Sequence, residues 1–177
     1  VEDIIKAKKI IIPGVGHYDA GMSAIDDLKI EEVLKEKVLV KKTPTLGICL
    51  GAQLMLCKSQ EGQRKGLSFI DGECVKFDKS KIGNNKIPNM GWIDTKFIKK
   101  SFICDSIKNY YRFYFVHSYH FKLKNKDNIL TESEYGYKYP SGFIKDNIIG
   151  LQFHPEKSHK YGMKIIKEFS NIDYEKI

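Results

Sequence analysis

Two short apolar runs, each ending in a glycine-flanked turn before a helical segment, constrain the fold most. Residues 9–12 stop at Pro13-Gly14, and residues 45–48 lead into Cys49 and then a helical segment at 52–56. Runs of this kind are typical of buried strands. A strand that feeds a helix through a short turn is typical of α/β proteins. The sequence therefore predicts a central, mostly parallel sheet with helices on both faces.

The remainder of the chain predicts two helices, with several β-rich segments between them. Residues 26–36 have helical spacing, and residues 161–169 form a second amphipathic pattern. Aromatic, β-rich segments separated by Gly, Asn and Asp turns are expected at 67–77, 89–97, 110–119 and 148–153. No repeat or linker divides the chain, so we expect a single domain over 1–177. Its first residues read as the end of a helix that leads into a strand, so we expect a further N-terminal piece before Val1.

Composition argues against nucleic-acid and membrane partners. The net charge is +8, but the lysines are scattered, and the nearest cluster, 122–126, reads as a solvated turn. No stretch of about 18 apolar residues could span a membrane, and no signal peptide is visible. The four cysteines, Cys49, Cys57, Cys74 and Cys104, form no CxxC pair. We therefore expect a cytoplasmic protein whose cysteines are reduced.

Cys49 has the local sequence of a nucleophile. Residues 47–51 read Gly-Ile-Cys-Leu-Gly, and a nucleophile between two glycines at a strand-to-helix turn is lifted clear of the sheet. The helix that follows favours a thiolate, and the Leu50 N–H would lie near a tetrahedral oxyanion. The pentapeptide alone leaves a buried, inert cysteine as an equal alternative. Cys57, Cys74 and Cys104 lack this setting and are expected to fill the core.

His154 is the best candidate for the base that a thiol nucleophile needs. It follows the apolar run 148–153 and precedes Pro155-Glu156. Proline favours an extended conformation at His154, and residues i and i+2 of an extended segment point the same way. The Glu156 carboxylate could then hold the imidazole. A metal site of His154, Glu156 and His159 is a weaker alternative, since no fourth ligand has a recognisable spacing.

Three motifs together resemble those of class I, or triad-type, glutamine amidotransferases. They are Pro-Gly-Val-Gly at 13–16, the elbow at 47–53 and Gln-Phe-His-Pro-Glu-Lys-Ser at 152–158. Two further segments, 90–92 and 114–119, are similar to those of the family's glutaminase subunits of imidazole glycerol phosphate synthase. The resemblance runs from Ala7 to Phe169, and it implies that a short strand and helix precede Val1. It implies a flavodoxin-like fold, hydrolysis of L-glutamine for histidine biosynthesis, and no metal or cofactor.

The resemblance also implies roles for individual residues. Cys49 would form a glutamyl thioester, while His154, held by Glu156, would move protons. The family's oxyanion donors match Val15 and Leu50, and the first of these can be turned away until the partner is ready. The positions that match the family's glutamine pocket are Gly16, Gln53, Glu61, Ser118 and Tyr119.

The implied partner is a cyclase subunit with a (β/α)₈ barrel, joined in a heterodimer, through which ammonia travels. Trp92 and Met90 match residues at that interface. The family motif there usually reads Pro-His-Met-Gly-Trp-Asn, whereas this chain has Asn89 and Ile93 at two of the positions. We expect both to face the partner. These changes leave open an alternative: a related glutaminase that supplies ammonia for an acetamidino group on a surface sugar.

Overall fold

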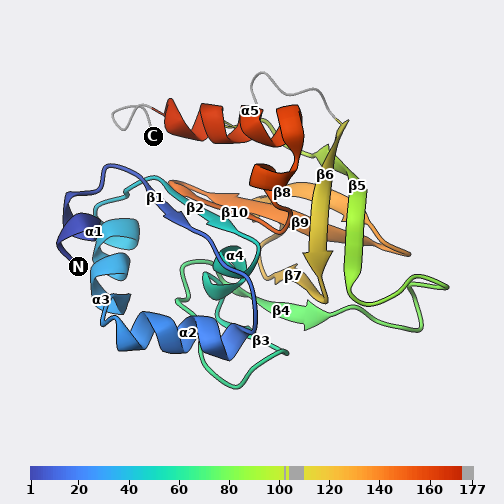
Figure 1. Cartoon of the computed structure of the whole chain (residues 1–177), viewed down its shortest axis with the longest axis horizontal. Helices are drawn as coiled ribbons and strands as arrows, with labels where there is room; N and C mark the ends of the chain where they lie inside the picture. Colours follow the sequence, from blue (N-terminus) through green and yellow to red (C-terminus); the bar gives the residue numbers. More distant parts are fainter. Residues whose placement is uncertain (102, 104–109, 173–177) are drawn as a thin grey trace.

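The main sheet has a parallel half and an antiparallel half. The computed structural model describes residues 1–101, 103 and 110–172. Within them, seven strands form this sheet in the order β1-β2-β10-β9-β8-β5-β6 (Figure 1). In that order, the strands span Ile10–Ile12, Thr45–Ile48, Ile148–Leu151, Lys138–Lys145, Ile129–Glu134, Asn89–Phe97 and Tyr110–His117.

Chain connections explain why the sheet is mixed. β2 pairs in parallel with β1 and with β10, because the helices between β1 and β2 provide a crossover. The pairs β10-β9, β9-β8, β8-β5 and β5-β6 are antiparallel. Turns at 135–137 and 146–147 join β8, β9 and β10, and such short connections allow only antiparallel neighbours. The predicted α/β class is confirmed, while the parallel arrangement is limited to the half that carries Cys49.

A smaller sheet lies beside the main one. In the described chain it consists of β3 (Lys58–Ser59), β4 (Gly72–Lys76) and β7 (Tyr119–Leu123). β6 ends at His117 and β7 begins at Tyr119, so the chain passes from one sheet to the other at Ser118. The strand predicted at 110–119 is therefore divided. This division creates a corner, and the corner matters for the site described below.

Helices cover both faces of the main sheet. α5 lies along one side, whereas α2 and α4 lie on the other (Figure 1). The core follows the same division: one cluster joins α2 and α4 to Phe121 and Phe143, and the other joins α5 to Phe113 and Phe153. The helical elements are α1 (Glu2–Lys6), α2 (Tyr18–Asp27), α3 (Glu31–Lys35), η1 (Glu36–Val40), α4 (Leu50–Leu54), η2 (Lys126–Asn128), η3 (Pro155–Lys157) and α5 (His159–Ser170).

The predicted helix at 26–36 is wrong in its bounds. α2 already begins at Tyr18, because the side chain of His17 caps it by accepting from the Asp19 N–H at 3.2 Å. The helix ends near Lys29, whose φ of 54° is left-handed. α3 and η1 then follow as separate elements. The early start of α2 was missed because Gly14, Gly16 and Gly21 predict a loop. The break between α2 and α3 was missed because the apolar residues keep a helical spacing across it.

Strand prediction failed where the sequence is polar or contains turn residues. β8 and β9 were not predicted, because four of the six residues at 129–134 are polar and β9 contains Pro140 and Gly142. The strand predicted at 67–77 is limited to Gly72–Lys76. The helix after Cys49 starts at Leu50, two residues earlier than expected. Asn89–Phe97 and Thr45–Ile48 are strands with the predicted bounds.

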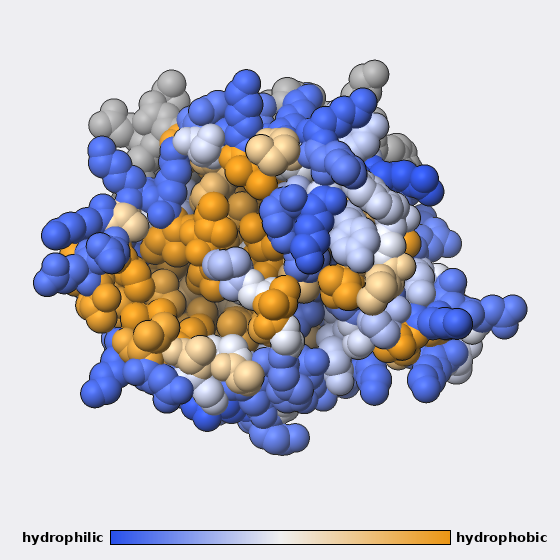
Figure 2. Space-filling view, in the orientation of Figure 1, coloured by the Kyte–Doolittle hydropathy of each residue, from blue (hydrophilic) through white to orange (hydrophobic). Residues whose placement is uncertain are grey.

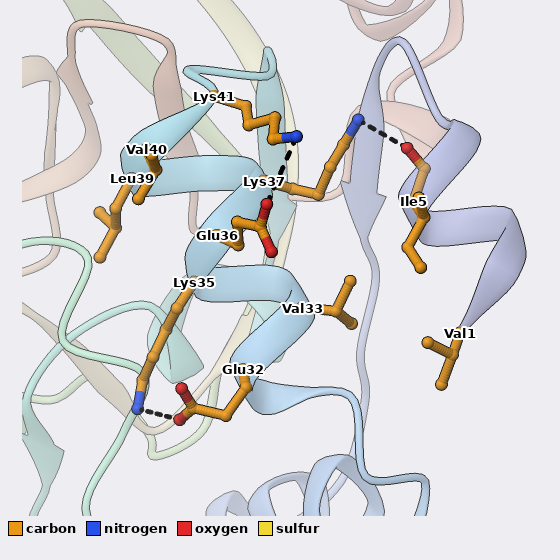
Figure 3. A pocket seen from close by; sticks show the side chains of 10 residues that line it. All are labelled: Val1, Ile5, Glu32, Val33, Lys35, Glu36, Lys37, Leu39, Val40 and Lys41. Carbon is orange, nitrogen blue, oxygen red and sulfur yellow. Dashed lines mark hydrogen bonds and ion pairs between the residues drawn. The ribbon is translucent and has the colours of Figure 1, made fainter.

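An apolar hollow lies on the side of the molecule that carries α1 and α3. Figure 2 shows the apolar surface there, and Figure 3 shows Val1, Ile5 and Val33 lining the hollow. Its volume is about 570 Å³. The Lys37 ammonium closes one end by donating to the Ile5 carbonyl at 3.0 Å. Its lining contains no histidine or cysteine, so it is not the candidate catalytic site.

No helix among the described residues has the length and apolarity needed to cross a membrane.

Candidate active site

Cys49 occupies a strained turn between β2 and α4. Its φ is 51° and its ψ is −112°, a conformation that non-glycine residues rarely adopt. Strain of this kind costs about 1–3 kcal/mol and persists only where the surrounding structure imposes it. The Cys49 N–H donates to the Leu151 carbonyl at 2.8 Å, which ties the turn to β10. The elbow predicted from the sequence is therefore present.

The two glycines beside Cys49 have a steric function. A Cβ at Gly47 would lie 2.7 Å from the Cα of Ala52, and a Cβ at Gly51 would lie 1.8 Å from the Ile12 carbonyl oxygen. Neither distance is possible for real atoms, and both obstructing groups are backbone. The glycines thus allow α4 to pass close to β1 and β2 directly after the nucleophile.

Burial determines the protonation state of the Cys49 thiol in this structure. The residue is only 7% exposed. Burial raises the pKa of Cys49 to about 11, while the Leu50 N–H and the Gln152 side chain act in the opposite direction. Gln152 donates from Nε2 to the sulfur at 3.7 Å. Cys49 is therefore a thiol near pH 7 and needs a base to become a nucleophile.

Alkylation of Cys49 by iodoacetamide tests this protonation state. Since the thiolate reacts and its pKa is raised, the rate in the free chain is expected to keep rising from pH 7 through pH 9 and to level off only near pH 11. Mass spectrometry of the Cys49 peptide gives the rate, with free cysteine, pKa ~8.5, as the reference thiol. A plateau below pH 8 would contradict the raised pKa.

His154 and Glu156 are bonded to each other at the end of β10. His154 Nδ1 and Glu156 Oε1 are 2.7 Å apart. Because a carboxylate accepts, Nδ1 carries the proton and Nε2 is left with a lone pair. His154 is extended, as predicted, but Glu156 lies in the 3₁₀ turn η3 rather than in an extended segment. The imidazole is buried, whereas the carboxylate is 45% exposed.

The backbone around His154 is held from both sides. Its N–H donates to the Tyr114 carbonyl at 2.9 Å, and its own carbonyl accepts from the Ser158 hydroxyl at 2.6 Å. His154 Nε2 is buried and has no hydrogen-bond partner among the described residues. A lone pair kept available in this way is what a general base requires.

One cavity of about 160 Å³ unites the predicted site. Every residue predicted as catalytic, oxyanion-donating or substrate-binding lines it, except Glu156, which stands behind His154. The lining residues are Val15, Gly16, Cys49, Leu50, Gln53, Glu61, Val116, His117, Ser118, Tyr119 and His154. Val116 and His117 were missed. Their position at the end of the aromatic strand, next to Ser118, was the available signal. Cavity lining does not test the individual roles, which remain predictions.

Two side chains predicted to hold glutamine, Gln53 and Glu61, are held in place by hydrogen bonds within the chain. Gln53 Nε2 donates to the Tyr119 carbonyl at 3.3 Å and to Gln152 Oε1 at 3.0 Å. These two bonds leave Gln53 Oε1 as the group that could accept from a ligand. Glu61 Oε2 accepts from the Tyr18 N–H at 2.9 Å, which anchors this carboxylate at the cavity.

One of the two predicted oxyanion donors is engaged by the protein itself. The Leu50 N–H donates to the Gly14 carbonyl at 3.3 Å. Val15, the other predicted donor, is 76% exposed on the loop that follows. An oxyanion could receive the Leu50 N–H only if the Gly14 carbonyl moved away. In this structure the Leu50 N–H is therefore engaged within the chain, directly beside Cys49.

The predicted interface residues lie on the outer face of β5. Met90 and Trp92 are 60% and 38% exposed. Asn89 and Ile93 point the other way, because side chains alternate along a strand, and Asn89 is fully buried. The expectation that these two residues face the partner is therefore wrong for Asn89, and Ile93 packs against the core.

The metal alternative finds no support. Among the described residues, no three histidine, cysteine or carboxylate side chains are arranged to hold a metal ion. The ring of His159 instead stacks on Trp92, with 5.3 Å between centroids and 4° between planes.

Cys74 is buried and Cys57 is partly buried, and both are free thiols. Cys104 lies outside the described residues.

A thiol and an imidazole that line one cavity, with a carboxylate bonded to the imidazole, are the groups that nucleophilic catalysis by cysteine requires. The family profile described as "Glutamine amidotransferase class-I" matches residues 2–171. The chain therefore belongs to the class I glutamine amidotransferase family.

Curated relatives match nearly the whole chain. "Imidazole glycerol phosphate synthase subunit HisH 2" of Methanococcus maripaludis is 49% identical over 169 residues, which cover 95% of this chain and 82% of the relative. The protein of the same name from Pseudomonas aeruginosa is 43% identical over 171 residues, covering 97% and 84%. The crystal structure of a putative GMP synthase component from Thermoplasma acidophilum has a TM-score of 0.66 at 20% identity, over 95% of this chain and 73% of that one. This last similarity concerns the fold alone.

Proposed function

We propose that this chain is the glutaminase subunit of an imidazole glycerol phosphate synthase. The observation that carries the proposal is the single cavity that contains Cys49, His154 and the predicted glutamine-pocket residues. Relatives at 49% and 43% identity, named as subunits of that synthase, support the same assignment. A thiol nucleophile is lost on oxidation, so a reducing compartment such as the cytoplasm suits this role.

The proposed reaction begins with proton transfer from Cys49 to His154 Nε2. The sulfur attacks the side-chain amide carbon of glutamine, and the imidazolium gives its proton to the departing nitrogen, so ammonia leaves and a glutamyl thioester remains. Water then attacks the thioester while His154 takes its proton, and that proton returns to the sulfur as glutamate leaves. Glu156 holds the imidazole and stabilises its charged form.

We also propose that the closed oxyanion hole restrains hydrolysis in the free chain. The Leu50 N–H cannot stabilise a tetrahedral intermediate while it donates to the Gly14 carbonyl at 3.3 Å. Turning the Gly14–Val15 peptide would release this donor and present a second one. A partner that binds near exposed Val15 could favour the turned form, so that glutamine is consumed only when ammonia has a recipient.

The chemistry of ammonia requires such a recipient. Free ammonia is protonated in water, and ammonium is not a nucleophile, so a closed route to a second enzyme is needed. The proposed recipient is the (β/α)₈-barrel cyclase subunit, which binds over the outer face of β5 to form a heterodimer. Met90 and Trp92 are exposed on that face.

A glutaminase assay tests the proposal. Glutamate production from L-glutamine should be slow with the free chain and should rise about 100-fold or more when the cyclase subunit of the same organism and its nucleotide ligand are added, since one oxyanion donor contributes about 10²–10³ in rate. Heat-denatured cyclase is the control. Absence of hydrolysis with the intact cyclase would overturn the assignment.

Trp92→Ala is expected to weaken binding of the cyclase subunit at least about tenfold, because exposed aromatic side chains often dominate interface energetics. Isothermal titration calorimetry measures the affinity. Leu28→Ala is the matched control, since Leu28 is another exposed apolar residue, 64% exposed, at the far end of α2. An equal loss of affinity for the cyclase subunit in both variants, or no loss of affinity in Trp92→Ala, would argue against this interface.

A second recipient of the ammonia remains a candidate, since both relatives carry the number 2 in their names. The alternative is an enzyme that makes an acetamidino group on a surface sugar. The glutaminase chemistry would be identical. Stimulation of hydrolysis by that enzyme and not by the cyclase would favour this alternative.

A further inference from the structure

His117 is a buried histidine that the proposed reaction does not use. It ends β6 and lines the cavity with Cys49. The residue is 5% exposed, and its ring packs against the rings of Phe77, Phe115 and Tyr139. Buried polar side chains are costly unless they are hydrogen-bonded, so the partners of this imidazole reveal its purpose.

The hydrogen-bond partners of the His117 ring define one tautomer. Nδ1 lies 2.8 Å from the Tyr119 carbonyl oxygen. A carbonyl only accepts, so Nδ1 carries a proton. Burial lowers the pKa of His117 to about 3, which leaves the ring neutral near pH 7 and Nε2 without a proton. Asn89 Nδ2 lies 3.1 Å from Nε2 and donates to it, and the Tyr139 hydroxyl lies 3.4 Å from the same nitrogen. Asn89 on β5 therefore complements the Nδ1–H form.

The Tyr119 carbonyl connects this pair to the glutamine pocket. It accepts both from His117 Nδ1 and from Gln53 Nε2, the latter at 3.3 Å. Gln53 also donates to Gln152, whose amide reaches the Cys49 sulfur at 3.7 Å. A continuous series of hydrogen bonds thus runs from the inner face of β5 to the nucleophile.

We propose that His117 is a positioning residue of the glutamine pocket, kept as the Nδ1–H tautomer by Asn89. It fixes the Tyr119 carbonyl and, through it, the orientation of the Gln53 amide. The chain needs such a clamp because Ser118, between His117 and Tyr119, is the corner at which it leaves one sheet for the other. This inference rests on the proposed glutaminase function for its kinetic consequence, but its structural part can be tested without activity.

Nuclear magnetic resonance of the uniformly ¹⁵N-labelled full chain tests the tautomer. The spectrum of wild type minus that of His117→Asn identifies the His117 ring signals among the five histidines. We expect a protonated Nδ1 and an unprotonated Nε2 that stay unchanged between pH 5 and pH 8. Protonation at Nε2, or titration within this range, would overturn the proposal.

Enzyme kinetics with the cyclase present test the positioning. His117→Phe removes the donor and is expected to raise the KM for glutamine about tenfold with kcat changed less than about threefold, because one buried hydrogen bond to the pocket wall is lost. His117→Asn places an amide N–H near the former Nδ1 and should keep KM within about threefold of wild type. An unchanged KM in His117→Phe would contradict the proposal.

His120→Phe is the matched control for a merely structural effect. His120 is also buried, and its ring bonds to Tyr137 and to the Phe121 carbonyl rather than to Tyr119. This variant should leave KM within about twofold. A tenfold rise here as well would mean that the aromatic cluster, not the clamp, sets KM.

If the wild-type chain hydrolyses no glutamine with the cyclase, the proposed function fails. The positioning of Gln53 by His117 can still be tested by nuclear magnetic resonance. The side-chain amide signal of Gln53 should shift in His117→Phe and stay in place in His120→Phe. No shift of that signal in His117→Phe would overturn the clamp.

Discussion

Cys49→Ala is expected to lower kcat for glutamine hydrolysis by at least about 10⁴-fold, because no thioester can form without the sulfur and the remaining groups provide only binding and polarisation. The protein should still fold, since the substitution removes one buried atom and leaves the glycines of the elbow in place. Glutamate release in the presence of the cyclase subunit gives kcat, and a thermal melt verifies folding.

Cys57→Ala is the control for Cys49→Ala. Cys57 is also a free cysteine, but it is only partly buried and its sulfur faces the Ile70 carbonyl at 3.6 Å, away from the cavity lining. The kcat of the Cys57→Ala variant should stay within about twofold of wild type. Full activity in Cys49→Ala would refute the thioester mechanism. Mass spectrometry of quenched wild-type reactions should in addition detect a glutamyl adduct on the Cys49 peptide.

Gly51→Ala is expected to have the largest effect on stability, lowering the free energy of unfolding by about 3 kcal/mol or more. An added Cβ would lie 1.8 Å from the Ile12 carbonyl oxygen, so β1 and α4 would have to separate. Backbone cannot give way as a flexible side chain does, which places this change at the upper end of overpacking costs. Urea denaturation measures the loss.

Gly21→Ala is the matched control in a helix. Gly21 lies inside α2, and its added Cβ would meet only the ends of the Leu54 and Leu50 side chains, at 3.0–3.3 Å. Those side chains can move, and alanine favours the helix by about 1 kcal/mol over glycine, so the net change should stay within about 1 kcal/mol. A similar loss in both variants would show that the Cβ of residue 51 has no special effect.

The elbow could be predicted from sequence because its constraints are local. A strand, a residue forced into an unusual conformation and a helix within a few positions leave their pattern in Gly47 and Gly51. Pro155 likewise favours the extended conformation of His154. The tautomer of His154 follows from a carboxylate only two residues away, at 2.7 Å.

The helix and strand errors have different causes. β8 and β9 are polar or contain proline and glycine, and their neighbours in the sheet stabilise them despite these weak local preferences. The extent of α2 depended on a cap from His17, an unusual capping residue. The strands were therefore missed because distant contacts stabilise them, whereas the start of α2 was missed because its local cap is an unusual residue type.

The interface prediction shows the same limit. Asn89 and Ile93 were expected to face a partner because they lie beside Trp92 in the sequence. In the structure their side chains point inward, since the pleat of β5 separates neighbours onto opposite faces. Asn89 therefore changes the interior beside His117, and Ile93 changes a position that packs against the core, so neither is on the exposed face of β5.

The sequence by itself determined the chemical groups and their order: a thiol at an elbow, then a histidine held by a nearby carboxylate, on an α/β scaffold. Only the tertiary structure decided which groups share the cavity, that the Leu50 N–H is engaged by Gly14, and that His117 is bonded to Asn89 and Tyr119. The reason is physical. Steric rules for a turn act over a few residues and are written in the local sequence, whereas burial and hydrogen-bond partners depend on strands that are distant along the chain and adjacent only after folding.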